Sequence, residues 1–113
     1  ALRVEPTLLV SGQERVYAVG DLTDVRESKR ADAARAQARV VIANISAQLA
    51  GKTPEVQYVP SDEWVILPLG PEHGVSQLLD SEGNARILGA DQTAEIKGAD
   101  LMVSGIRSQL NLP

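Results

Sequence analysis

Hydrophobic positions in this chain form one long periodic segment and several short runs. Between Ala31 and Leu49, apolar residues recur three or four positions apart, which predicts an amphipathic helix. Ser28 is a suitable N-cap, which leaves Lys29 at the first helical position, and Gly51 ends the helix. The first half of the apolar stripe is built from Ala, so the helix backbone can approach a flat neighbour closely. The stripe consists of Ala31, Ala34, Ala38, Val41, Ile45 and Leu49.

The short apolar runs before this helix predict strands. Residues 2–4 and 7–10 form a small antiparallel feature, and a turn at 11–14 leads into the run 15–19. Because residues 16–19 are apolar almost without interruption, we expect a strand buried on both faces inside a larger sheet. That strand ends at Gly20-Asp21.

After Pro54 the pattern changes to short β-type runs at 56–59, 64–69, 74–79 and 85–88, with a strong turn cluster at 80–84. We expect an antiparallel sheet of three or four strands.

The end of the chain is predicted to be helical in two pieces, 91–97 and 101–110, the second capped by Asp100. The fold class is therefore α+β. We place a domain boundary after residue 51, giving residues 1–51 and 52–113.

The composition of the chain argues against several classes of function. With 113 residues the chain is one domain's worth of material, and its net charge of −4 and 3% aromatic content argue against a nucleic-acid partner. It has no Cys, and its lone histidine and scattered carboxylates lack metal-ligand spacing. No apolar run approaches the roughly 20 residues that span a bilayer, and no signal-like block precedes the first strand, so the expected location is cytoplasmic.

Gly20-Asp21 is the most informative motif. A strand that ends in Gly-Asp before a helix can direct a carboxylate and the helix N-terminus at the hydroxyls and charged atoms of a ligand. Here the motif continues as Asp-Val-Arg-x-x-Lys at 24–29 and then into the Ala-rich helix.

Together these features resemble the second flavin-binding motif of the pyridine-nucleotide-dependent flavoproteins. Within that superfamily the chain is most similar to the apoptosis-inducing-factor-like quinone reductases, the ferroptosis suppressor branch, and to their type II NADH dehydrogenase relatives. The likeness covers roughly residues 1–75.

The resemblance implies a role for three residues in binding FAD. Asp21 would accept a hydrogen bond from the ribityl chain, with Gly20 allowing close backbone approach. Lys29 would lie near the flavin ring, where a cation stabilises negative charge, and we take it as the catalytic candidate. Two simpler interpretations stay open: Gly20-Asp21 as an ordinary turn, and Lys29 as a solvated residue of a basic stretch.

Other candidates carry less weight. Asp24 and Arg26 match the branch, but a local ion pair or cap explains them equally well. Ala36-Gln37-Ala38 is faintly similar to the quinone-pocket pattern of type II NADH dehydrogenases, in a register that fits poorly. We expect His73 to be a surface turn residue. We expect Tyr58 and Trp64 to be core or interface residues.

The chain has no Gly-x-Gly-x-x-Gly loop for a dinucleotide pyrophosphate, so neither FAD nor NAD(P)H should bind tightly to it alone. By resemblance, it is expected to be the C-terminal part of an FAD-dependent NAD(P)H:quinone-type oxidoreductase. That part would comprise the last strand and helix of the FAD domain followed by a small α+β domain, and would be inactive by itself. Its expected partner is the N-terminal FAD/NAD-binding portion of the same protein. The alternative is a non-enzymatic dimerisation module. The electron acceptor, the choice of nicotinamide cofactor and peripheral membrane contact stay open.

Overall fold

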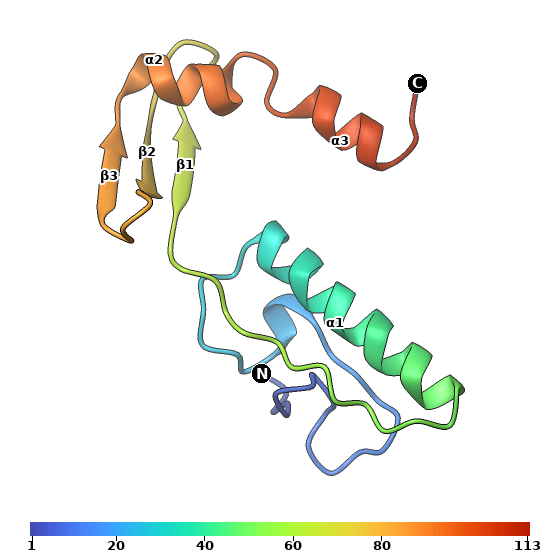
Figure 1. Cartoon of the computed structure of the whole chain (residues 1–113). Helices are drawn as coiled ribbons and strands as arrows, with labels where there is room; N and C mark the ends of the chain where they lie inside the picture. Colours follow the sequence, from blue (N-terminus) through green and yellow to red (C-terminus); the bar gives the residue numbers. More distant parts are fainter. The chain divides into compact units, whose positions relative to one another are not determined.

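The computed structural model describes residues 1–113, which divide into two compact units, Ala1–Ser61 and Asp62–Pro113. Helices and a small antiparallel sheet confirm the α+β fold class (Figure 1). The predicted domain boundary after residue 51 concerns the domains of a longer flavoprotein and stays a prediction. No helix is long and apolar enough to cross a membrane.

In the first unit, one long helix lies beside irregular extended segments. A single 3₁₀ turn, η1 (Gly20–Leu22), precedes the helix α1 (Ala31–Leu49). The predicted strand at 15–19 is wrong for this chain, because this run meets a neighbour on one side only and Val16 is 50% exposed. Isolated bridges replace the expected sheet. They pair Leu2 with Thr23, Val4 with Val10 and Leu9 with Tyr17.

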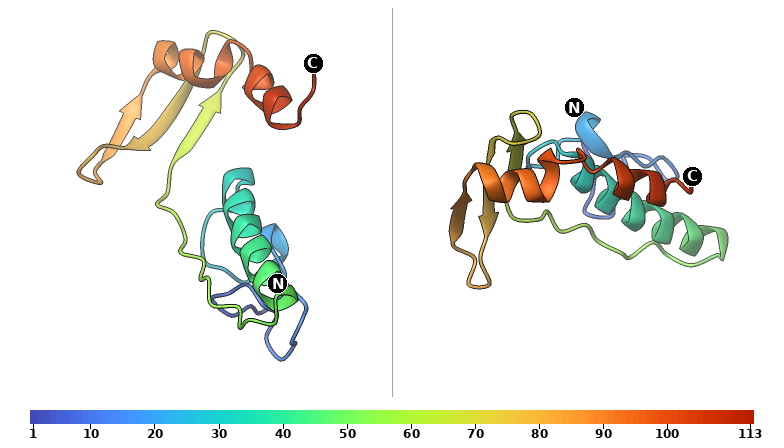
Figure 2. Two further views of the ribbon diagram at one scale, coloured as in Figure 1. Left: turned by 45° about the vertical axis from the view of Figure 1, so that its right-hand side comes forward. Right: turned by 90° about the horizontal axis from the view of Figure 1, so that it is seen from above.

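The segment that follows α1 runs back along the helix in an extended form, as the further views also show (Figure 2). The predicted strand at 56–59 does not form. Its backbone groups bond elsewhere: the amide of Val56 donates to the side chain of Asn44 at 3.0 Å, and the amide of Tyr58 donates to the carbonyl of Pro6 at 2.8 Å. Side-chain and loop partners therefore take the place of a neighbouring strand.

The start of α1 differs from its prediction by two residues. Arg30 is the N-cap, with extended backbone angles (φ −129°, ψ 153°), and Ala31 is the first helical residue. Ser28 and Lys29 therefore lie before the helix. The reason is the Lys29 side chain, whose ammonium turns back to two backbone carbonyls of the preceding loop.

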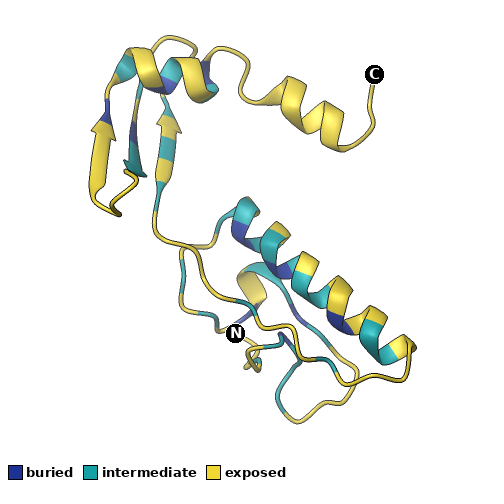
Figure 3. Cartoon of the chain, in the orientation of Figure 1, coloured by how far each residue is buried: buried dark blue, intermediate teal, exposed yellow.

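The buried face of α1 is rotated relative to the predicted stripe. Ala33, Gln37 and Asn44 are buried, whereas Ile45 is 40% and Leu49 84% exposed (Figure 3). Two buried amides occupy the centre of this face because hydrogen bonds to neighbouring segments satisfy them. An apolar stripe is left on the exposed side. It consists of Ile42, Ile45 and Leu49.

The second unit contains the predicted antiparallel sheet, with strand order β1-β2-β3. Its strands are β1 (Val65–Pro68), β2 (Gly74–Leu79) and β3 (Ala85–Leu88). Val65 pairs with Gln77, and Gln77 pairs with Ile87, which fixes the register across all three strands. The predicted turn at 80–84 is confirmed, since the Asp80 carboxylate accepts backbone N–H bonds from Glu82 at 2.9 Å and from Asn84 at 2.8 Å.

Helical segments follow the sheet. A helical turn, α2 (Ala90–Thr93), continues into the π-helical segment η2 (Ala94–Gly98) and packs on the sheet, where Thr93 and Ser76 share a buried hydrogen bond of 2.8 Å. The last helix, α3 (Val103–Gln109), is shorter than the predicted 101–110 and is exposed along its whole length (Figure 3). The predicted N-cap Asp100 is wrong, because Met102 is the N-cap of this helix. The Asp100 carboxylate still supports the start of the helix, since it accepts a hydrogen bond from the Ser104 hydroxyl at 2.5 Å.

Candidate functional site

The Gly20-Asp21 turn is held against the N-terminal half of α1. Gly20 has φ +75°, a conformation that favours glycine, and a Cβ built on it would lie 3.7 Å from the Ala34 Cβ. The turn therefore needs glycine for its backbone angle rather than for space. Thr23 closes the turn, donating from both its amide (3.1 Å) and its hydroxyl (2.9 Å) to the Gly20 carbonyl.

Asp21 is exposed at this turn, and its carboxylate accepts no hydrogen bond from residues 1–113. An Asx turn would instead use the carboxylate to bond a nearby backbone N–H, as Asp80 does in the second unit. Asp21 thus keeps its acceptor oxygens available for a donor outside this turn.

Lys29 anchors the loop that follows Asp21. Its Nζ donates to the carbonyl of Thr23 at 3.0 Å and to the carbonyl of Val25 at 2.9 Å. An ammonium group has three N–H donors, so these two carbonyls leave one donor for a further partner. Lys29 can therefore brace the loop and present a cation at the same time.

Asp24 and Arg26 lie within the same loop. The Asp24 carboxylate accepts the Val4 amide at 3.0 Å, and the Asp24 amide donates to the Leu2 carbonyl at 2.9 Å. These bonds tie the loop to the start of the chain, in agreement with a structural role for Asp24. Arg26 is exposed.

A part-buried hydrogen-bond network joins this loop to α1. Gln37, 1% exposed, accepts the Gly20 amide at 2.6 Å and donates to the Glu27 carboxylate at 2.5 Å. The other oxygen of Glu27 accepts the Tyr58 hydroxyl at 2.7 Å. We call Gly20, Gln37, Glu27 and Tyr58 the Gln37 network. It connects three parts of the first unit that are distant in sequence.

The surroundings of Tyr58 in this network change the pKa of its phenol group. Burial, followed by the hydrogen bond to Glu27 and repulsion from its carboxylate, raises the pKa of Tyr58 to about 12. The phenol therefore stays protonated and remains a donor to Glu27 throughout the physiological pH range.

Sequence reasoning missed this network. It singled out Gln37 only as part of a faint quinone-pocket pattern, and it did not consider Glu27 or Asn44. The available signal was a pair of amides at positions 37 and 44, seven residues apart and so on one helical face, beside the buried Ala33. In the structure, the Gln37 side chain bonds to protein groups at both ends.

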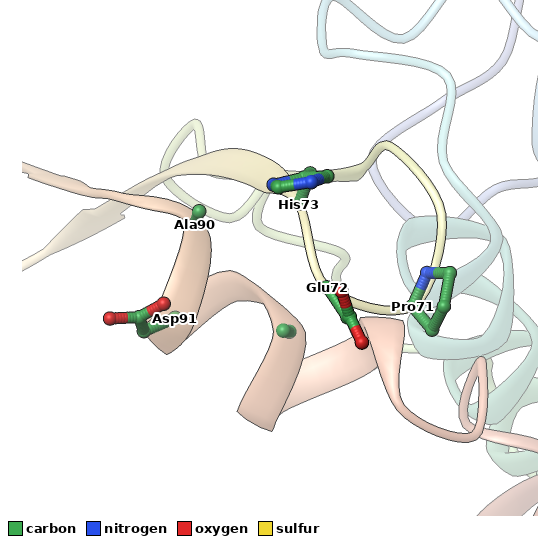
Figure 4. Close-up of a pocket in the computed structure, with 6 residues that line it drawn as sticks. Pro71, Glu72, His73, Ala90 and Asp91 are labelled. Carbon is green, nitrogen blue, oxygen red and sulfur yellow. The ribbon is translucent and has the colours of Figure 1, made fainter.

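His73 lies elsewhere, in the second unit, exposed in the turn between β1 and β2 as predicted. With Glu72 and Asp91 it lines an open pocket of about 560 Å³ (Figure 4). No three His, Asp or Glu side chains of residues 1–113 gather to hold a metal ion. Neither Asp21 nor Lys29 lines this pocket.

Comparison with known proteins identifies relatives of the whole chain. Ferroptosis suppressor protein 1 of Taeniopygia guttata is 36% identical over 104 residues, 92% of this chain and 26% of the relative. Apoptosis-inducing factor homolog B of Dictyostelium discoideum is 32% identical over 114 residues, covering 99% of this chain and 28% of the relative. The chain is homologous to the ferroptosis suppressor and apoptosis-inducing factor homologue proteins. The predicted resemblance to this branch is thereby confirmed.

A further relative, the FAD-dependent oxidoreductase FVFD30 of Flammulina velutipes, is 27% identical over 106 residues, or 94% of this chain. No family model matches the chain. The chain spans about a quarter to a third of the length of these three relatives.

Proposed function

We propose that this chain is the C-terminal part of a longer FAD-dependent NAD(P)H:quinone-type oxidoreductase, in which it holds the flavin ribityl chain and one edge of the flavin ring. The observation that carries the proposal is the Asp21 carboxylate, exposed and unengaged beside a Gly20 backbone that is fixed from two sides. Homology to proteins named as ferroptosis suppressors and as an FAD-dependent oxidoreductase supports it.

The residues fit a flavin in three respects. Asp21 offers an acceptor to a ribityl hydroxyl, Lys29 offers a cation, and the N-terminus of α1, which has no side-chain cap, follows two residues after Lys29 in the chain. The bound FAD would supply the redox chemistry, taking hydride from NAD(P)H and passing electrons to a quinone-type acceptor. The protein groups would orient the flavin and stabilise negative charge at its pyrimidine edge.

The test uses the longer protein that contains this chain. Asp21→Ala should lose flavin, since an unpaired buried hydroxyl costs about 1–3 kcal/mol, or roughly ten- to a hundredfold in affinity. Lys29→Ala should keep flavin but reduce quinone more slowly, because the cation acts mainly where charge develops. Flavin occupancy and steady-state quinone reduction measure these two effects.

The matched control is Asp24→Ala. It removes a neighbouring carboxylate whose partner is the Val4 amide, so it should retain flavin. If Asp21→Ala keeps wild-type flavin affinity and Lys29→Ala turns over normally, the proposed roles are wrong and Gly20-Asp21 is an ordinary turn.

The exposed stripe of α1 supports the same proposal. Ile42 (65%), Ile45 (40%) and Leu49 (84%) lie on one side of the helix, and an uncovered apolar face of this kind marks an interface. We propose that the N-terminal FAD/NAD-binding portion of the longer protein covers it.

The competing function is a dimerisation module in which a second copy covers the stripe. Sedimentation of the longer protein separates these alternatives. If Ile42→Lys turns a dimer into a monomer that keeps its flavin, the second copy is the occupant. If the variant loses flavin without a change in oligomeric state, the FAD/NAD-binding portion is the occupant.

A further inference from the structure

The Gln37 network reaches the candidate site through the backbone of Gly20, and it contains neither Asp21 nor Lys29. Gln37 bonds to Gly20, the residue before Asp21, and to Glu27, two residues before Lys29. One buried side chain therefore bonds at two points to the loop that carries Asp21 and Lys29, beside Asp21 and two residues before Lys29. Within that loop, the Lys29 ammonium bonds to the Thr23 and Val25 carbonyls, which ties Lys29 to the part of the loop near Gly20.

We propose that Gln37 is a positioning residue, whose amide fixes the loop from Gly20 to Lys29 on α1 so that Asp21 and Lys29 meet the flavin together. This inference rests on the proposed function. It assigns a role to a residue that touches neither flavin nor substrate.

The Gln37 amide makes both bonds because it carries an acceptor oxygen and a donor nitrogen. The Gly20 N–H needs an acceptor, and the Glu27 carboxylate needs a donor. A glutamate at 37 would accept from Gly20 but would set a second negative charge against Glu27. An aliphatic residue would leave both groups without their partner in a region where Gln37 is only 1% exposed.

The same helix supplies a control for a merely structural effect. Asn44 is also a fully buried amide on the inner face of α1, with exposure of 0%. It bonds to the Thr7 carbonyl at 3.0 Å and to both backbone groups of Val56 at 2.8 and 3.0 Å, and it has no bond to the loop 20–29. Replacing it should destabilise the first unit while leaving both bonds of Gln37 to the loop in place.

The experiment compares Gln37→Met, Gln37→Asn and Asn44→Leu in the longer flavoprotein. Four quantities are measured: thermal unfolding, FAD affinity of the apoprotein, kcat and KM for quinone reduction, and the flavin absorption spectrum. We expect Gln37→Met to bind FAD at least tenfold more weakly, to shift the flavin spectrum and to lower kcat, with little change in KM for NAD(P)H. Gln37→Asn keeps the amide but is one methylene short of spanning both partners. It should change the same quantities in the same direction, and it serves as the test if Gln37→Met does not fold.

Asn44→Leu should lower thermal stability as much as Gln37→Met does, yet keep wild-type FAD affinity, spectrum and kcat. The inference is overturned if the Gln37 variants keep these three properties, or if Asn44→Leu loses them in proportion to its loss of stability. Asp21→Ala separates this inference from the proposed function. If Asp21→Ala loses FAD while the Gln37 variants do not, the positioning role alone fails. If Asp21→Ala keeps wild-type affinity, the proposed function fails.

Discussion

Asn44 should hold the segment after α1 in place, and its replacement gives the sharpest test of the fold. Its side chain makes three hydrogen bonds, of 3.0, 2.8 and 3.0 Å, to Thr7 and Val56, and is fully buried. At about 1 kcal/mol net for each bond, Asn44→Ala should lower the free energy of unfolding of the first unit by about 3 kcal/mol.

The local readout is hydrogen exchange. The Val56 amide donates to the Asn44 side chain, so its protection depends directly on this residue. A loss of about 3 kcal/mol corresponds to exchange roughly a hundredfold faster. Exchange measured by mass spectrometry over residues 52–61, together with denaturant unfolding, would show both effects.

Gln48→Ala is the matched control on the same helix. Its side chain makes one exposed hydrogen bond, to the Glu14 carbonyl at 2.9 Å, so its loss should cost about 0.5 kcal/mol or less. If Asn44→Ala costs no more than Gln48→Ala, or leaves exchange over 52–61 unchanged, then the segment is held by other contacts and the reasoning is refuted.

Three further outcomes are expected. Gly74→Ala should destabilise the second unit by about 1–3 kcal/mol, because the added Cβ would lie 2.5 Å from the Leu67 carbonyl oxygen and 2.6 Å from Thr93 Cγ2. The control Gly89→Ala, whose Cβ would have no atom within 4 Å, should leave the thermal unfolding temperature nearly unchanged. Folding raises the pKa of Tyr58 from 10.0 to about 12, so the unfolded state loses the phenol proton first as the pH rises. The free energy of unfolding should therefore be unaffected by this group below pH 10 and should fall as the pH rises towards 12. This pH dependence should disappear in Tyr58→Phe. The isolated 113-residue chain should be colourless, and stoichiometric flavin absorbance in the purified chain would contradict its dependence on the rest of the protein.

Local sequence patterns predicted the elements of the second unit well. The sheet, its turn at 80–84 and the helical end follow from short-range signals: alternating β-type runs, an Asx-rich turn and helical spacing. The family resemblance also came from local motifs, Gly20-Asp21 and the Asp-Val-Arg-x-x-Lys that follows. These features depend on neighbours in the chain, which the sequence displays directly.

The first unit was predicted less well because its pairings are distant. The run 15–19 reads as a buried strand, but a strand needs neighbours, and here one side has none. Apolar spacing predicted the wrong buried face of α1, because two of the residues on the true buried face are amides, Gln37 and Asn44. From the sequence alone, Gln37 and Asn44 look like surface residues. Gln37 is buried because it bonds to residues 20 and 27, and Asn44 because it bonds to residues 7 and 56.

The sequence by itself determined the fold class, the position of the long helix and the motif that links this chain to the flavoproteins. Only the tertiary structure decided that Lys29 precedes the helix and bonds to the carbonyls of its own loop. It alone decided that one buried glutamine ties that loop to α1. Helical and turn propensities act over a few residues, whereas the partner of a buried polar group is set by how distant segments pack.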